Sequence, residues 1–157
     1  MQRLINTKRK DLDLTWTYSQ KEKSIKPRGL WYGINYEWLE WCKGNFSIHN
    51  EMIEIDIDSS KILLIENPQQ LYSLMGIFGY NIVEGVKYID WEKLSKYYSG
   101  IEFQNYHQTK NSFDLHNLPT WFYTLDCSSG CIWDLSVIKN YTHSELDLSL
   151  WVDDSEH

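Results

Sequence analysis

The chain has 157 residues, of which 42% are hydrophobic and 24% charged, a composition typical of one globular domain and not of a disordered chain. Its net charge of −7 argues against nucleic acid as the main partner, because phosphate contacts require clustered lysine and arginine. No apolar run approaches the ~18 residues of a membrane span and no signal peptide precedes the first strand, so a cytoplasmic location is expected.

Hydrophobic periodicity predicts the elements in chain order within a single domain of residues 1–157, with residues 1–11 and 147–157 as frayed polar tails. Residues 12–18 alternate between apolar and polar, which predicts a strand with one buried face. The run at residues 61–66 is continuously apolar, as expected of a central strand buried on both faces. The same reasoning predicts further strands at residues 29–34, 51–58 and 101–106, helices at 36–43, 68–78 and 91–98, a polar loop at 107–119, and a last strand or short helix at 135–141.

Three of these boundaries have a capping signal. Asn35, Asn67 and Asp90 each precede a helical pattern and are predicted N-caps. Strands outnumber helices and come partly in adjacent pairs. The predicted fold class is therefore α+β, with a mixed, mainly antiparallel sheet of about six strands and about three helices.

Residues 121–134 form the most informative segment. Its aromatic start predicts a strand, and small polar residues then form a corner that leads into a second apolar run. Asp126 is predicted to accept hydrogen bonds from the amides of Ser128, Ser129 and Gly130, as in an Asx-type turn. Such a corner is either a structural turn or the floor of a binding site, and the sequence leaves both open.

Cys127 and Cys131 stand four residues apart and invite two chemical interpretations. Zinc sites usually show two pairs of ligands separated by about two to four residues, whereas this chain has one loose pair, so no metal is expected. A cysteine nucleophile would need a histidine base, with Asp126 orienting it, and no local signature supports one. Small buried thiols are the preferred interpretation. The other cysteine and the histidines considered for these sites are Cys42, His107 and His116.

Two further patterns concern a ligand pocket. A pair of carboxylates facing across a cleft would suit hydrolysis, and Glu102, Asp126 and Asp134 are the candidates. Aromatic faces beside cations suit a planar anionic ligand such as a nucleotide, although an aromatic core with basic side chains at its rim would show the same pattern. The candidate ligand-binding residues are Lys26 and Arg28 for phosphate, Trp31, Tyr32 and Trp133 for stacking, and Tyr123 and Ser129 beside them; the candidate acids are Glu102 and Asp126.

The motifs Lys26-Pro27-Arg28-Gly29-Leu30-Trp31-Tyr32 and Trp38-Leu39-Glu40-Trp41-Cys42 resemble those of an uncharacterised family of small proteins from bacteriophages, large DNA viruses and some bacteria. Two more matches, at residues 89–102 and 121–133, follow in the same order, so the resemblance covers most of the chain. It implies a small viral-type protein in the host cytoplasm and no particular activity. Relatives carry an aromatic and an arginine pair where this chain has residues 107–110, which puts an anion site there in doubt.

A fold-level analogy points to ADP-ribosyltransferase-like domains, with Tyr18 or Ser19, Tyr32 and Glu102 in the places of their polar, aromatic and acidic residues. The analogy implies NAD as a ligand. Those enzymes place Glu or Gln two residues before the catalytic Glu, whereas Gln104 follows Glu102 here.

Two functions follow as hypotheses. The first is a protein that binds a nucleotide-like ligand in an aromatic-lined cleft and acts on NAD in the manner of an ADP-ribosyltransferase. The second is a non-enzymatic accessory or inhibitor protein that contacts a host protein through exposed aromatic side chains and an acidic surface.

Overall fold

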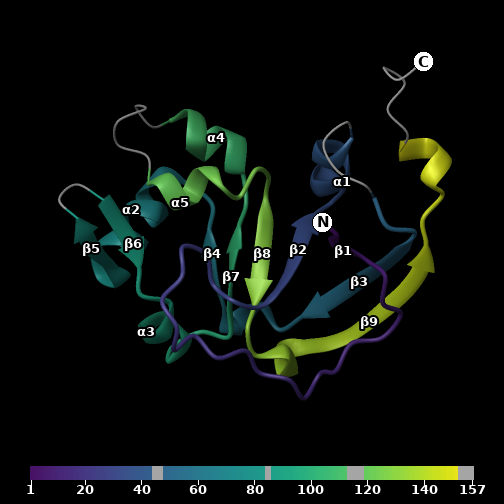
Figure 1. Ribbon diagram of the computed structural model, residues 1–157, viewed down its shortest axis with the longest axis horizontal. Coiled ribbons are helices and arrows are strands. Elements are labelled where there is room, and N and C mark those ends of the chain that lie inside the picture. The colour runs from purple at the N-terminus through teal and green to yellow at the C-terminus, as the bar shows by residue number, and fades with distance from the viewer. Residues whose placement is uncertain (44–47, 84–85, 113–118, 152–157) are drawn as a thin grey trace.

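The computed structural model describes residues 1–43, 48–83, 86–112 and 119–151 (Figure 1). Within them the elements are β1 (Arg3–Thr7), β2 (Leu30–Ile34), α1 (Glu37–Cys42), β3 (Glu51–Ile57), η1 (Ser59–Lys61), β4 (Ile62–Ile65), α2 (Pro68–Phe78), β5 (Gly79–Val83), β6 (Val86–Ile89), α3 (Trp91–Ser95), β7 (Gly100–Phe103), α4 (Tyr106–Asn111), α5 (Thr120–Tyr123), β8 (Ser129–Ile132), η2 (Leu135–Val137), β9 (Ile138–Glu145) and η3 (Leu148–Trp151). None of the helices in these residues is long and apolar enough to cross a membrane.

The α+β class is confirmed, and the sheet is mixed. In the described residues it has seven strands, in the order β4-β7-β8-β2-β1-β3-β9, and β5 and β6 form a separate hairpin. The prediction of about six strands and three helices was imprecise, since seven sheet strands and five α-helices are described. Only β4 and β7 run parallel among the pairs of this sheet. Figure 1 shows the hairpin and helices α2 to α5 gathered around the β4 end, with α1 nearer β1 and β2.

Two main hydrophobic clusters lie against the sheet. One contains Leu71 of α2, Leu94 of α3 and Trp121 of α5. The other contains Ile53 and the remaining inward residues of β3. Because the side chains of a strand alternate between its faces, one sheet can support both clusters.

Several predicted elements are confirmed. In β3 the isoleucines are buried while Glu54 and Asp56 are exposed, as the period-two pattern indicates. Asn67 caps α2 by accepting a hydrogen bond from the Gln70 amide at 2.9 Å. Asp90 caps α3 in the same way, although α3 ends at Ser95, three residues before the predicted end.

The N-terminal segment differs from its prediction. Residues 3–7, expected within a frayed tail, form strand β1 between β2 and β3. The polar side chains that suggested fraying have partners far along the chain: Arg3 bonds the buried Glu102, and Asn6 donates to the His49 carbonyl at 2.6 Å. Residues 12–18, expected as a strand, are a loop whose Thr17 makes one bridge to Asp134.

Other differences concern element type and place. Residue 121, expected to begin a strand, lies in helix α5, and residues 107–111 of the expected loop lie in helix α4, which begins at the last residue of the expected strand 101–106. Strand β4 lies at the end of the sheet and not in its centre. Asn35 does not cap α1, because its backbone adopts a left-handed φ of 53° and its side chain accepts a bond from the Gln2 amide instead.

Candidate functional site

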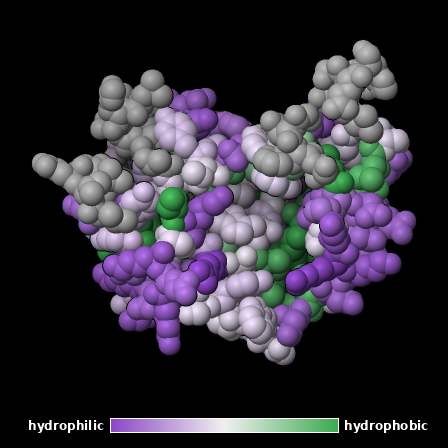
Figure 2. Space-filling view, in the orientation of Figure 1, coloured by the Kyte–Doolittle hydropathy of each residue, from purple (hydrophilic) through white to green (hydrophobic). Residues whose placement is uncertain are grey.

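A pocket of about 290 Å³ opens where β1 and β2 separate. The two strands pair at only two positions, Arg3 with Ile34 and Leu4 with Gly33. Beyond these pairs consecutive residues of both strands line the space, as expected of a gap between diverging backbones. We call this space the β2 pocket; it is lined by Leu4, Ile5, Asn6, Lys26, Trp31, Tyr32, Gly33, Trp38, Thr124, Leu125, Asp126, Cys127 and Ser129. Figure 2 shows weakly polar and apolar residues in the middle of one molecular face, between hydrophilic margins.

The corner between α5 and β8 forms one wall of the β2 pocket. Asp126 has a φ of 66°, a left-handed conformation that costs free energy in a residue other than glycine. The predicted Asx turn is not among the hydrogen bonds of the described residues; the Cys127 amide bonds the Leu125 carbonyl at 2.8 Å instead. The Asp126 carboxylate is therefore left available to the pocket.

Ser129 supplies an unsatisfied polar group. Its side chain is only 7% exposed, and its Oγ has no hydrogen-bond partner among the described residues. Buried hydroxyls in native proteins are nearly always paired with protein, water or ligand. Ser129 lines the β2 pocket, and its Oγ lies just behind the pocket surface, so a small shift of the neighbouring side chains would let an occupant bond this hydroxyl.

Lys26 brings a cation to the rim. Its Nζ lies 5.6 Å from the centre of the Trp31 ring and 3.4 Å from the Thr124 carbonyl oxygen. The ammonium thus has only weak protein partners and is exposed to solvent. An anion beside the Trp31 ring would be within its reach.

Below the pocket, Glu102 joins three strands. The Tyr32 hydroxyl donates to Glu102 Oε1 at 2.7 Å, Arg3 Nε donates to the same oxygen at 2.6 Å, and Gln104 Nε2 donates to Oε2 at 2.6 Å. Glu102 is 2% exposed and does not line the pocket. Its carboxylate is thus already saturated with donors, in the arrangement of a structural ion pair.

Gly130 makes this arrangement possible. It pairs with Tyr32 on one side and Glu102 on the other, and the Tyr32 ring crosses it to reach the carboxylate. A Cβ at Gly130 would lie 2.2 Å from Tyr32 Cζ. Burial, and then the nearby Glu102 charge, raise the pKa of Tyr32 well above its usual value, so Tyr32 remains a neutral donor to Glu102.

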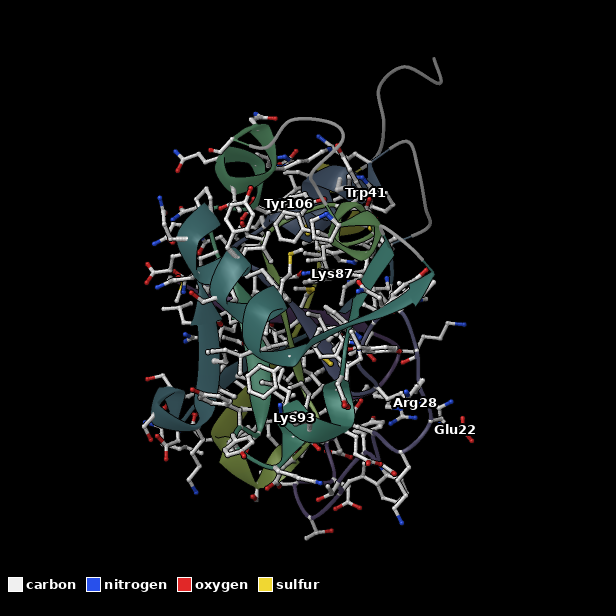
Figure 3. All side chains as sticks on the ribbon, turned by 90° about the vertical axis from the view of Figure 1, so that its left-hand side faces the viewer. Glu22, Arg28, Trp41, Lys87, Lys93 and Tyr106 are labelled. Atoms are coloured by element: carbon white, nitrogen blue, oxygen red, sulfur yellow. The ribbon has the colours of Figure 1, made fainter. Side chains whose placement is uncertain are left out.

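Five of the nine predicted site residues line the β2 pocket: Lys26, Trp31, Tyr32, Asp126 and Ser129. The other four lie elsewhere. Glu102 lies beneath it, and Arg28 is exposed and paired with Glu22 at the periphery (Figure 3). Trp133 is buried, and its Nε1 donates to the Tyr98 carbonyl at 2.8 Å. Tyr123 lies against Lys110, whose Nζ is 5.2 Å from its ring centre.

Sequence reasoning missed Asn6 and Trp38 in the lining of the pocket. Asn6 lies in β1, and the polar residues of that strand hide its period-two pattern in the sequence. Trp38 reaches the pocket because α1 packs closely on β2, where a Cβ at Gly33 would lie 2.9 Å from Trp38 Cβ. A glycine in the strand that leads into a Trp-bearing helix was the available signal for this close approach.

The other proposed chemistries find different surroundings. Asp134 accepts hydrogen bonds from the Ser136 amide and hydroxyl and lines a separate pocket with Trp133, away from Asp126. His107 is exposed on α4, and His116 lies outside the described residues. In the described part of the chain no three His, Cys, Asp or Glu side chains are grouped to hold a metal ion.

The three thiols are expected to react slowly in the native protein. Cys42, Cys127 and Cys131 are buried, and burial is the main cause that raises the pKa of Cys127 to about 12 and shifts the other two upward. Because the thiolate is the reacting form, labelling with an aromatic disulfide reagent at pH 8 should be about 100-fold slower than in the guanidinium-unfolded protein. Rapid labelling of one native thiol would contradict this expectation.

Comparisons with protein-family models, curated proteins and solved structures find no match. The resemblance to the viral-type family therefore stays a prediction. The geometry of the β2 pocket is the feature of the described residues that indicates a function.

Proposed function

We propose that the protein binds a small planar ligand with an anionic group, of the size of one nucleotide, in the β2 pocket. The observation that carries the proposal is the unpartnered, buried hydroxyl of Ser129 in the same pocket as Lys26 and Trp31. An aromatic face, a cation and a few fixed polar groups are the usual elements of such a site.

Each part of the ligand has a counterpart in the pocket. A flat ring stacks on Trp31, and a phosphate or carboxylate accepts from the Lys26 ammonium. Hydroxyl or amino donors, such as those of a ribose or a base, bond the Asp126 carboxylate. An acceptor or donor on the ring completes the hydrogen bonding of Ser129.

The volume favours a mononucleotide over NAD. At about 290 Å³ the pocket is just below the ~300–1,000 Å³ typical of ligand sites. One half of a dinucleotide fills that space. If chemistry on NAD does occur, Asp126 is the better-placed acid, since Glu102 is saturated by Arg3, Tyr32 and Gln104.

Thermal unfolding with a nucleotide panel tests the proposal. Adenosine, AMP, ADP and NAD are each added at millimolar concentration, and a mononucleotide at 100 times its Kd is expected to stabilise the protein by about 2.7 kcal/mol. Isothermal titration then gives the Kd. A melting temperature that no member of the panel changes would refute ligand binding of this class.

Two substitutions locate the ligand. Ser129→Ala removes a hydroxyl that bonds nothing in the described protein, so the fold should be kept while affinity falls about 3- to 10-fold. Lys26→Gln should weaken anionic ligands about 10-fold and adenosine much less. Lys87→Gln, an exposed change on β6 (Figure 3), is the matched control and should leave both affinities unchanged. Equal losses in all three variants would place the ligand elsewhere.

A second candidate function, contact with another protein, is favoured by a different region. Ile77 and Tyr97 are 61% and 69% exposed near the β4 end of the sheet. Large apolar side chains gathered in this way commonly mark interaction surfaces. Contact with a host protein remains a prediction of the sequence.

A further inference from the structure

Strand β4 is an open, apolar sheet edge. It ends the sheet and, among the described residues, pairs only with β7 (Figure 1). Its four residues, Ile62 to Ile65, are all aliphatic. An unpaired row of backbone donors and acceptors with aliphatic side chains is a template for another strand.

The opposite edge of the sheet is protected. Strand β9 exposes Lys139, Asn140, Thr142 and Glu145 along its length, and its ladder to β3 has an irregularity at Asp56 and Ile57. Charged side chains and ladder irregularities are the usual means by which proteins prevent edge pairing. Among the described strands of this sheet, β4 is the edge strand with neither charged side chains nor a ladder irregularity.

A groove of about 500 Å³ follows β4. Leu63, Leu64 and Ile65 line it consecutively. Since the side chains of a strand alternate between its faces, three consecutive residues share one groove only if it runs along the backbone edge. The far wall comes from α2 and from α3 with the turn that follows it, where Ile77 and Tyr97 are exposed.

We propose that this edge pairs with β4 of a second copy, antiparallel across a two-fold axis, so that the two sheets become continuous. The aliphatic run Ile62-Leu63-Leu64-Ile65 has the same chemistry in both directions. A two-fold axis perpendicular to the sheet keeps equivalent side chains of the two copies on the same face. Leu63 or Leu64 of one copy then lies opposite the same residue of the other copy at the axis. In either register the central pairs are aliphatic.

The charges that flank β4 favour the antiparallel direction. Lys61 precedes the strand and Glu66 follows it. Antiparallel pairing brings Lys61 of one copy to the same end of the joined strands as Glu66 of the other, on opposite faces of the sheet because the two residues are five positions apart. Their attraction is therefore long-range and strongest at low salt, whereas parallel pairing would bring like charges to the same end.

Sedimentation equilibrium over about 1 μM to 1 mM tests the proposal. The protein is expected to dimerise reversibly, and Leu64→Lys, which gives β4 the kind of residue that protects β9, should weaken the dimer at least 100-fold. Thr142→Lys places the same residue on the opposite edge and should leave it unchanged. Far-UV circular dichroism and the melting temperature of each monomer verify that the fold is kept.

Charge exchange tests the direction of pairing. Lys61→Glu and Glu66→Lys should each weaken the dimer several-fold at low salt, and the double exchange should restore it. A protein that stays monomeric at the highest concentration overturns the proposal, as does a dimer that Leu64→Lys does not affect. A dimer that Thr142→Lys disrupts would assign the interface to β9 and equally overturn it.

Discussion

Replacing Glu102 with glutamine is expected to lower the free energy of unfolding by about 3 kcal/mol, and Glu102→Ala by about 3–5 kcal/mol. The loss arises because Arg3 would remain without its carboxylate partner. Arg3 bonds Glu102 with Nε at 2.6 Å and with Nη2 at 3.3 Å, and its side chain is only 18% exposed. Without the carboxylate, the largely buried Arg3 guanidinium has no counter-charge. Leaving one buried charge unpaired destabilises a protein more than replacing both partners with apolar residues does.

Chemical denaturation at pH 7 measures this effect. The matched control is Glu54→Gln, on the exposed face of β3, which should change the free energy of unfolding by less than about 0.5 kcal/mol. The double replacement Arg3→Met with Glu102→Met should recover much of the loss, since no unpaired charge then remains. A loss below about 1 kcal/mol for Glu102→Gln would mean that Arg3 finds water easily and that the network is not buried in solution.

The substitution Gly130→Ala is expected to destabilise the protein by about 3 kcal/mol, in the upper part of the range for overpacking. The added methyl group would lie 2.2 Å from Tyr32 Cζ and 2.3 Å from its hydroxyl oxygen. The ring cannot move away cheaply, because its hydroxyl is bonded to the buried Glu102. Either the hydrogen bond breaks or strands β8 and β2 shift.

Gly76→Ala provides a control of opposite sign. Gly76 lies within α2 and an added Cβ meets nothing within 4 Å, so alanine should stabilise the helix by about 0.5–1 kcal/mol. In a Tyr32→Ala background the cost of Gly130→Ala should fall below about 1 kcal/mol, which a double-mutant cycle detects. If the cost is unchanged in that background, the clash with Tyr32 is not its cause.

The five Asp-x-Ser/Thr segments that lie in the described residues show how far local sequence predicts local structure. At Asp13, Asp58, Asp134 and Asp147 the carboxylate accepts from the amide two residues on, as such segments predict. Asp126 has the same local sequence and does not; its backbone is left-handed, and the residue lines the β2 pocket. No local pattern distinguishes it from the other four, since the difference is imposed by the packing of α5 and β8.

Strong periodicity predicted β3, β4 and α2, and caps predicted where two helices begin. It failed for β1 because the polar residues of that strand are satisfied by Glu102 and the His49 carbonyl, which are far away in sequence. It failed for α5 because aromatic residues favour strands only weakly, and tertiary packing placed Trp121 in a helix at the core. Lys26 and Ser129 could be predicted as a pair of candidates, whereas their shared pocket depends on where β1 and β2 separate.

The position of β1 and β2 also decides when the sheet can form. Strand β2 joins two halves, since β1 and β3 lie on one side of it and β8 and β7 on the other. Its partner on the β1 side is near in sequence, but its partner β8 follows about a hundred residues later in the chain. Pairing across such a distance requires closure of a long loop and slows folding. The three strands β1 to β3 can associate early, whereas the second half of the sheet, and with it the complete wall around the pocket, must wait for β8.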